Sequence, residues 1–262
     1  MVAQSVSSEL DYVNFPPSVD NYHDDFVNHG LAVIPDFLSQ WAVNRIIEQT
    51  INLLPEAYHS KLVGNAYLSA LDKSLPADHP YNMSEKTSLS TIAFDEIPYA
   101  HLLREVYQSE TVKQMVAAIV GENELHFYAC PMGAINIAVM RDGDYLRWHF
   151  DQCDFVVSIP IQDPIGGGHY QYAKDVRASD NPNYDGVRHV LTGQHPGITE
   201  LKASPGSLIV FRGRNTIHRV TKIEGDRPRL VALLAYATTP DCDSSDHLKM
   251  IRYGRTHVKS PA

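Results

Sequence analysis

The sequence predicts a mainly β protein whose helices lie in the N-terminal part, organised as one domain over residues 1–262. Two observations support this prediction. From about residue 125 onward, short β-branched runs alternate with turn sequences such as "RDGD", "GGG", "SPG" and "EGDRP", a pattern typical of antiparallel sandwiches and barrels. Before that point, two longer stretches carry apolar residues at helical spacing. We therefore expect a mostly helical part over residues 1–124 to pack on a β core over residues 125–262.

The N-terminal part begins with residues 1–20, which are rich in Ser, Pro and Asn and predict a loose arm. The stretch "GLAVIPDFL" (30–38) predicts a short strand. Ser39 has the side chain of a helix N-cap, and the following segment 40–54 carries apolar residues at the spacing of one helical face. A helix is therefore expected over that segment.

The stretch 58–90 is rich in turn-forming residues and has no clear period, so it predicts a long loop that covers another part of the molecule. A helical pattern returns at 99–120. Ser109 interrupts this pattern and Gly121 ends it, because serine favours the start of a helix and glycine its end.

The C-terminal part consists mainly of short runs with strand character. One longer insertion, 173–200, contains a further short helix in "NYDGVRHVL". The runs that predict strands are "LHFYAC", "INIAVM", "FVVSIPI", "HYQYA", "SLIVF", "IHRVTKI" and "RLVALLAY".

The charge and composition of the chain limit its partners. A formal charge of −9 argues against nucleic acid and anionic membranes, because both bind basic surfaces. No apolar run approaches the ~18 residues of a membrane span, and the N-terminal stretch lacks the basic and apolar regions of a signal peptide. Three cysteines without a C-x-x-C spacing fit neither a disulfide framework nor a zinc site. These features predict a cytoplasmic protein.

One short stretch, "YLRWHFDQCDFVV", places a histidine and a carboxylate two positions apart at the start of a strand. Side chains alternate along a strand, so His149 and Asp151 share one face while Phe150 takes the other. Two satisfied polar residues at the end of a strand would explain this pair. A metal site would explain it as well, and residues elsewhere in the chain decide between the two.

A second histidine, His218, opens a later β-branched run after the turn "RGRN". With His149 and Asp151 it makes the 2-His-1-carboxylate pattern, in which three ligands occupy one face of a metal and leave positions for substrates. This pattern suits non-haem Fe(II) and O2. A surface or core role is the simpler explanation for any single one of the 13 histidines. The conjunction of all three residues in a predicted barrel favours the metal site.

An arginine, Arg229, begins the next strand eleven positions after His218. If the turn "EGDRP" forms a hairpin, Arg229 lies opposite Ile223, on the order of 15 Å along the sheet from His218 at ~3.3 Å per residue. A short diacid that chelates the metal would then reach the guanidinium, whose planar fork binds a carboxylate through two hydrogen bonds. Arg227 is the competing candidate, although it lies inside the turn. A solvated charge is the ordinary role of either arginine.

These residues resemble the iron(II)/2-oxoglutarate-dependent oxygenases, which have a double-stranded β-helix, or jelly-roll (cupin-like), fold. The likeness extends over "RWHFDQCDFVVSIPIQDPIGGGHYQYAKDVR", "NYDGVRHVLTGQ", "SPGSLIVFRGRNTIHRVTKIEGDRPRLVALLAY" and "RYGR". Together with "LPADHPYN" and "FDEIPYAHLLREVYQSE", this series is similar to the branch that contains free amino-acid hydroxylases and radical amino-acid halogenases. The resemblance covers most of the chain from about Gly30.

The resemblance implies that His149, Asp151 and His218 bind Fe(II). It also implies that Arg229 binds the distal carboxylate of 2-oxoglutarate, the cosubstrate that is consumed with O2. Halogenases of this branch carry Gly or Ala in place of the carboxylate ligand, which frees a position for chloride. Because Asp151 is retained here, the resemblance implies a dioxygenase that hydroxylates an unactivated C–H bond rather than a halogenase.

The substrate is expected to be a small molecule, and the resemblance implies a free L-amino acid. Packing or surface exposure would explain each of the four candidate substrate-binding residues, which are Trp148, Asn136, Arg252 and Tyr253. Among these, Arg252 is the candidate partner of the substrate carboxylate. The stretch 127–136 contains no acidic residue to bind an ammonium group, which argues against lysine in particular and leaves other amino acids open.

Other functions stay open from the sequence alone. The same iron site would serve desaturation or oxidative cyclisation, or would act on an acyl thioester or a peptide. A non-enzymatic jelly-roll binding protein, with a structural metal or none, is the alternative outside enzymes. Arg229 argues against it, since such a protein needs no clamp for a diacid. The sequence leaves the oligomeric state open, with a homodimer as one option.

Overall fold

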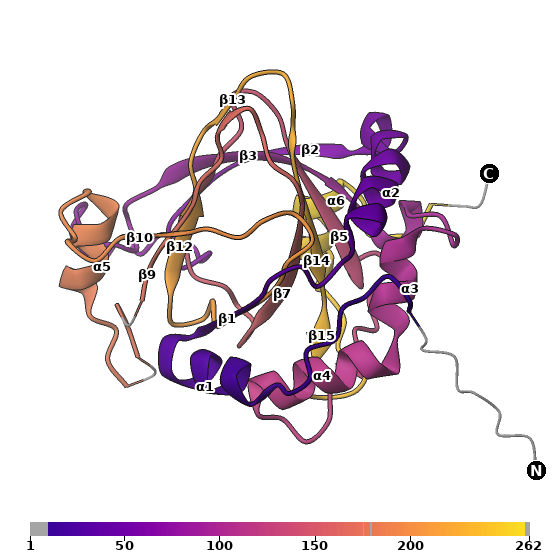
Figure 1. Cartoon of the computed structure of the whole chain (residues 1–262). Coiled ribbons are helices and arrows are strands. Elements are labelled where there is room, and N and C mark those ends of the chain that lie inside the picture. The colour runs from indigo at the N-terminus through magenta and orange to yellow at the C-terminus, as the bar shows by residue number, and fades with distance from the viewer. Residues whose placement is uncertain (1–9, 175, 179, 260–262) are drawn as a thin grey trace, which may run out of the picture.

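Two antiparallel β-sheets and a layer of helices make up the chain in this computed structural model, which describes residues 10–174, 176–178 and 180–259 (Figure 1). In spatial order, the larger sheet contains β1 (Leu31–Ile34), β11 (Leu208–Phe211), β7 (Val156–Gln162), β14 (Arg229–Leu234), β5 (Ile135–Met140), β3 (Glu85–Ile92) and β2 (Tyr58–Gly64). The smaller sheet contains β10 (Thr199–Leu201), β9 (Tyr170–Ala173), β12 (Ile217–Val220) and β6 (Leu146–His149). Every neighbouring pair within both sheets is antiparallel, and the expected jelly-roll fold is confirmed.

Helices and short strand pairs complete the described part of the chain. The helices are α1 (Asp20–His29), α2 (Gln40–Ile51), α3 (Leu102–Gln108), α4 (Glu110–Val120), α5 (Tyr184–Leu191) and α6 (Asp246–Tyr253), with the 3-10 turns η1 (Leu54–Glu56) and η2 (Phe94–Glu96). The short pairs join β13 (Ile223–Glu224) to β8 (Gly166–Gly167) and β15 (Tyr236–Ala237) to β4 (His126–Phe127). No described helix has the length and apolar character to span a membrane.

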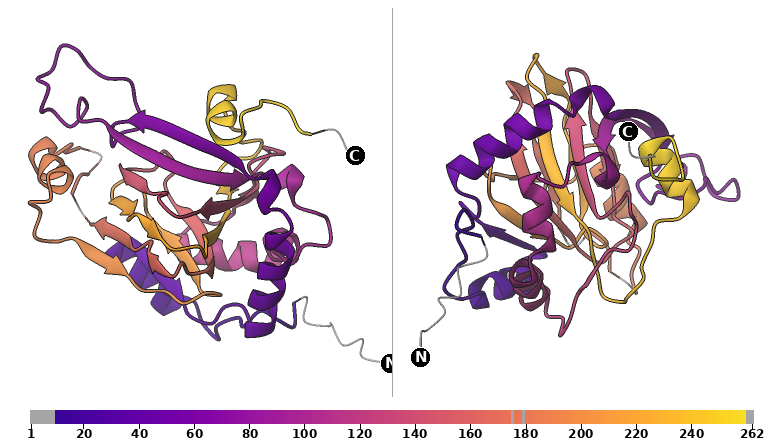
Figure 2. Two further views of the ribbon diagram at one scale, coloured as in Figure 1. Left: turned by 90° about the horizontal axis from the view of Figure 1, so that it is seen from above. Right: turned by 90° about the vertical axis from the view of Figure 1, so that its right-hand side faces the viewer.

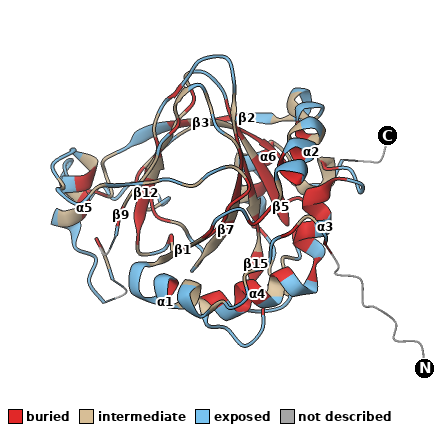
Figure 3. Cartoon of the chain, viewed as in Figure 1, coloured by how far each residue is buried: buried red, intermediate tan, exposed pale blue. Residues whose placement is uncertain are grey.

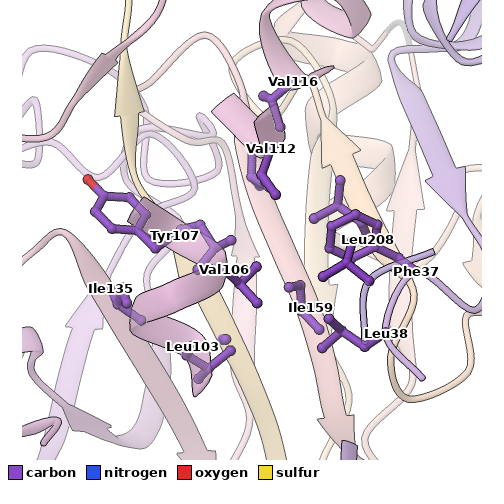
Figure 4. Packing of buried hydrophobic residues seen from close by; sticks show 14 of the residues in the cluster. Phe37, Leu38, Leu103, Val106, Tyr107, Val112, Val116, Ile135, Ile159 and Leu208 are labelled. Atoms are coloured by element: carbon purple, nitrogen blue, oxygen red, sulfur yellow. The ribbon is translucent and has the colours of Figure 1, made fainter. Parts of the chain in front are cut away.

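The main hydrophobic core lies between the larger sheet and helices α1 to α4, where buried residues concentrate (Figure 3). Figure 4 shows part of it, in which Leu103 and Val106 of α3 lie near Ile135 of β5. Burial of each such aliphatic side chain contributes roughly 1.5–3 kcal/mol. Because strand side chains alternate, the residues between those core positions, such as Asn136 and Met140, point to the opposite face of the larger sheet.

A second hydrophobic cluster covers the outer face of the smaller sheet. Trp148, Phe150 and Ile217 pack there with Val187 and Val190 of α5. The loop that joins β2 to β3 supplies further members of this cluster and projects on the same side as α5 (Figure 2). The outer face of strand β6 is therefore closed by protein, and its other face is the one that carries chemistry.

Three local predictions of helix ends are confirmed. Ser39 caps α2, since its hydroxyl accepts a hydrogen bond of 3.3 Å from the backbone N–H of Ala42. Ser109 separates α3 from α4 and caps the second helix in the same way, through Val112. Gly121 ends α4 in a left-handed conformation with φ 80°, which glycine adopts without steric cost.

Several expectations for the N-terminal part are wrong. The stretch 58–90 is a hairpin of β2 and β3, and only residues 65–84 form a loop. The buried residue of β2 is the polar Ser60, whereas Val63 is exposed, so this strand lacks the alternation of buried apolar and exposed polar residues that marks a strand in a sequence. The expected arm over 1–20 lies partly outside the described residues, and within it Val13 forms a β-bridge with Leu38. Helices α1 and α6 have few buried residues and were not predicted.

The expected hairpin between His218 and Arg229 is also wrong. Strand β12 lies in the smaller sheet, whereas β14 lies in the larger sheet between β5 and β7. Arg229 is therefore paired with Met140, and Ile223 is paired with Gly167. The turn after β13 carries the chain from one sheet to the other.

Candidate metal centre

Two neighbouring strands of the smaller sheet carry two histidines opposite each other. His149 ends β6, and His218 on β12 is its direct partner in the antiparallel register. The ring centroids lie 4.1 Å apart with 54° between the ring planes. Both residues are buried. The pairing of the two strands therefore brings together residues that are far apart in the sequence.

Backbone carbonyl groups orient both imidazole rings. Nδ1 of His149 lies 2.9 Å from the carbonyl oxygen of Arg147, and Nδ1 of His218 lies 3.0 Å from that of Thr216. A carbonyl oxygen only accepts, so Nδ1 carries the hydrogen in each ring and Nε2 keeps its lone pair. Burial and the nearby His218 lower the pKa of His149 to about 3. His149 is thus the neutral ligand form at neutral pH, and a fixed tautomer of this kind is typical of metal-binding histidines.

Asp151 lies two residues beyond the end of β6 and completes the group. Its Oδ1 lies 3.6 Å from Nε2 of His149, and its Oδ2 lies 3.6 Å from Nε2 of His218. One ligand atom from each residue lies within 4.8 Å of the other two. Ligand atoms that share one first-row metal ion, with bonds of about 2.1 Å, are about 3–4 Å apart. Two imidazoles and one carboxylate at these distances fit the facial ligand set of non-haem Fe(II).

Tyr170 on β9 links this centre to the expected arginine. Its ring stacks on His218 with centroids 5.4 Å apart, and it also contacts Phe211 edge-on at 5.5 Å. Burial raises the pKa of the Tyr170 phenol well above its usual range, Asp151 adds to this rise, and Arg229 opposes it. The hydroxyl is therefore within electrostatic reach of both Asp151 and Arg229, and it makes no hydrogen bond in the described part of the chain.

Arg229 occupies the inner face of the larger sheet. Its partner Met140 belongs to a small apolar cluster with Val220 and Tyr170 packed against it. Gly168 makes room for it, because a Cβ at that glycine would lie 3.2 Å from Cδ of Arg229. Burial lowers the pKa of Arg229, while Asp163 and Tyr170 raise it. No other described residue forms a hydrogen bond or ion pair with the guanidinium, which leaves its fork available to an anion.

Arg227, the competing candidate, lies in different surroundings from Arg229. Arg227 is exposed in the turn before β14, where its Nη2 donates a hydrogen bond of 3.1 Å to the carbonyl oxygen of Pro164. This contact holds it on the outer loop of Asp163 to Ile165 rather than between the sheets.

The four candidate substrate residues lie in different surroundings. Trp148 is buried on the outer face of β6, under the guanidinium of Arg219 at 4.7 Å, and so points away from the metal side of that strand. Asn136 is buried on the inner face of the larger sheet, where its carbonyl oxygen accepts a hydrogen bond of 2.6 Å from the hydroxyl of Tyr253. The structure therefore brings Asn136 and Tyr253 together and separates them from Trp148.

Arg252 is exposed on the last turn of α6, close to the loop that follows β6. Burial raises the pKa of the Cys153 thiol, Arg252 opposes this rise, and Asp151 adds to it. The thiol is thus within electrostatic reach of Arg252 and of Asp151. Tyr128 also lies within reach of Arg252, and its hydroxyl is 3.3 Å from the hydroxyl of Ser244.

Tyr170 is the residue near the site that the sequence patterns did not single out. It precedes Tyr172, the direct partner of His218, by two positions, and side chains two apart on a strand share a face. The alternation in "HYQY" was therefore a usable signal. What the sequence does not show is that this strand pairs with β12.

The fold and the ligand geometry together define the class to which the chain is similar. AviO1 from Streptomyces viridochromogenes Tue57 has a TM-score of 0.57 at 15% identity, with 87% of this chain and 98% of that chain covered. An oxidoreductase of the 2OG-Fe(II) oxygenase family from Burkholderia pseudomallei has a TM-score of 0.52 at 12% identity, with 88% and 95% covered. The fold is that of the iron- and 2-oxoglutarate-dependent oxygenases.

The family of the chain is narrower than this class. The chain belongs to the Halogenase D family, which matches residues 16–252. A comparison with curated proteins gives no match. Among the solved structures of the same fold, the epimerase SnoN from nogalamycin biosynthesis was solved with Fe3+, alpha-ketoglutarate and nogalamycin RO, at 12% identity and a TM-score of 0.56 with 84% and 83% covered. The superfamily expected from the sequence is thereby confirmed.

Proposed function

We propose that the protein is a non-haem Fe(II)/2-oxoglutarate-dependent dioxygenase that hydroxylates an unactivated C–H bond of a free L-amino acid. The observation that carries this proposal is the position of Asp151 against both imidazoles, at 3.6 Å from each Nε2. Iron bound there, with 2-oxoglutarate and O2, would supply the oxidising power for the C–H bond. His149, Asp151 and His218 would hold the ion and leave positions on it for the cosubstrate and O2.

Arg229 and Tyr170 fit the distal carboxylate of 2-oxoglutarate. Arg229 offers a guanidinium with which no described residue forms a hydrogen bond or ion pair, and the Tyr170 hydroxyl lies within electrostatic reach of it and of Asp151. Two charge-assisted hydrogen bonds from a planar guanidinium, together with one from a phenol, would fix a dicarboxylate in one orientation. The apolar side chains of Met140 and Val220 beside Tyr170 would exclude water from that end of the site.

The carboxylate on the iron decides between hydroxylation and halogen transfer in this proposal. The chain belongs to the Halogenase D family, but this membership does not itself decide the reaction. Asp151 would fill the position that halogenases of this branch leave to chloride. With Asp151 present, an added chloride has no free place on the protein-facing side of the ion. We therefore assign hydroxylation to this chain.

A free amino acid is the substrate class that the surroundings of the site favour. Arg252 is exposed beside the loop of Asp151, and no described residue forms an ion pair with it. It would bind the substrate carboxylate, while Asn136 and Tyr253, joined by a 2.6 Å hydrogen bond, would offer buried polar groups. The net charge of −9 disfavours an anionic macromolecule as the substrate.

Anaerobic addition of Fe(II) and then 2-oxoglutarate tests the iron chemistry, because a metal-to-ligand charge-transfer band in the visible spectrum requires both to bind. A panel of free amino acids, acyl thioesters and short peptides then tests the substrate, scored by succinate release and by a product that gains one oxygen atom in mass. A response confined to thioesters or peptides would defeat the amino-acid assignment and leave the iron assignment intact. Loss of two hydrogens in place of oxygen gain would indicate desaturation or cyclisation.

A further inference from the structure

The carboxylate of Asp151 lies against a glycine from another part of the chain. Gly213 is buried in the loop that carries the chain from β11 in the larger sheet to β12 in the smaller sheet. Its carbonyl oxygen accepts a hydrogen bond of 3.0 Å from the backbone N–H of Asp151. The two residues are therefore held together by their backbones, independently of any metal.

The space beside Gly213 is filled by the carboxylate. A Cβ built on Gly213 would lie 1.6 Å from Oδ2 of Asp151, 2.5 Å from its Cγ and 2.8 Å from its Cβ. All three distances are far inside van der Waals contact. Gly213 does not have a positive φ, so glycine is not required here by its backbone conformation. It is required by the side chain of Asp151.

A Cβ at Gly213 would clash with the carboxylate oxygen of Asp151 that a metal ion would bind. Rotation of the Asp151 side chain would relieve the contact with Oδ2, but it would also carry the carboxylate away from the two imidazoles. The contact with Cβ of Asp151 would stay after that rotation, so the loop would have to move as well. An added methyl group at 213 is therefore more costly in the metal-bound state than in the metal-free state.

We propose that Gly213 is a positioning residue for the metal centre: the absence of a side chain there holds Asp151 in the position where it ligates iron. This inference rests on the proposed function for the identity of the metal, while the contact itself does not. A side chain at 213 would occupy the space that the Asp151 carboxylate fills, so a larger residue at 213 requires a smaller residue at 151.

A double-mutant cycle tests this coupling. The variants are Gly213→Ala, Asp151→Gly and the pair together, with Gly166→Ala as the matched control, because a Cβ there would meet only ordinary contacts of 3.4 Å and beyond. The thermal midpoint is measured without metal and with Fe(II) under argon, and Fe(II) affinity is measured by titration. Gly213→Ala should weaken Fe(II) binding by about 10- to 100-fold and reduce the rise in thermal midpoint that Fe(II) produces, while Gly166→Ala should change neither.

In the Asp151→Gly background the same alanine should be tolerated. The metal-free midpoint that Gly213→Ala lowers on its own should return toward that of Asp151→Gly alone, and any residual Fe(II) affinity should stay within about twofold of that variant. Equal losses of midpoint in both backgrounds would overturn the proposal, as would wild-type Fe(II) affinity in Gly213→Ala. If the unmutated protein binds no Fe(II), the proposed function fails, and the metal-free midpoints still decide whether the two positions are coupled.

Discussion

Replacing Arg229 with alanine tests whether 2-oxoglutarate binds to this arginine or to Arg227, the competing candidate two positions earlier. Removing one partner of a buried, hydrogen-bonded charge pair costs roughly 2–5 kcal/mol, which corresponds to a loss of about 30-fold to 4,000-fold in 2-oxoglutarate affinity. Arg229 is partly buried between the sheets and pairs with no described side chain in the free protein. The loss should therefore appear in cosubstrate binding rather than in stability.

Arg227→Ala is the matched control. Arg227 is exposed, and its guanidinium donates a hydrogen bond of 3.1 Å to the carbonyl oxygen of Pro164, so its removal should change 2-oxoglutarate affinity by less than about 1 kcal/mol. Arg229→Lys keeps the charge and loses the planar fork, and we expect it to lie between the two alanine variants. The assay is anaerobic titration of 2-oxoglutarate into the Fe(II) protein, followed by the visible charge-transfer band, with the metal-free thermal midpoint as the check on folding. A larger loss in Arg227→Ala than in Arg229→Ala would refute the assignment.

Three further predictions concern the metal ligands and the stability of the helical layer. His218→Ala should weaken Fe(II) binding by more than about 100-fold, since outer contacts alone account for 10–100-fold, and full activity in this variant would rule out the triad. Asp151→Gly should lose most hydroxylation, whereas the unmutated protein supplied with chloride should give no chlorinated product by mass spectrometry; such a product would contradict the role of Asp151. Burial and the nearby Arg104 lower the pKa of His101 from 6.5 to about 4. Between these two pH values the unfolded chain binds a proton at this histidine that the folded protein does not. The free energy of unfolding should therefore be intact above pH 6.5 and fall by up to about 3 kcal/mol as the pH drops to about 4. His101→Asn, which keeps an N-cap acceptor for α3, should flatten this fall in urea unfolding curves, and an unchanged pH dependence would count against it.

The cluster of candidate metal ligands could be predicted because the signal is local. His149 ends β6 and Asp151 lies two positions later, so the alternation of side chains continued from the strand places them on one face. His218 opens a strand of the same small sheet, and its residue type completes a known ligand set. For these three residues, chemistry and short-range geometry agree without any knowledge of the distant pairing of the chain.

The register of Arg229 could not be predicted because it depends on that distant pairing. A turn between two strand-like runs suggests a hairpin, and many such turns form one. Here β12 and β14 pair with different neighbours, so Arg229 lies opposite Met140 rather than Ile223. The hydrophobic pattern of β14 is satisfied by burial in the centre of the larger sheet, between β5 and β7.

Trp148 shows a prediction that the sequence itself argued against. It adjoins His149 on a strand, and adjacent side chains point to opposite faces. The structure buries it with Phe150 and Ile217 under α5, on the face of β6 opposite to the one that carries His149. The hydrogen bond between Asn136 and Tyr253 could not be predicted, because no local sequence pattern indicates a contact between residues so far apart in the chain.

If the chain hydroxylates as proposed, its reaction type depends on two places in the sequence rather than one. Asp151 supplies the carboxylate from the end of β6, and Gly213 supplies the space for it from the loop that crosses between the two sheets. A substitution at either place removes the carboxylate from the same position, one by deleting it and the other by displacing it. In this chain, the residue at 151 and the residue that faces it at 213 together decide whether a carboxylate can occupy the position beside the two imidazoles.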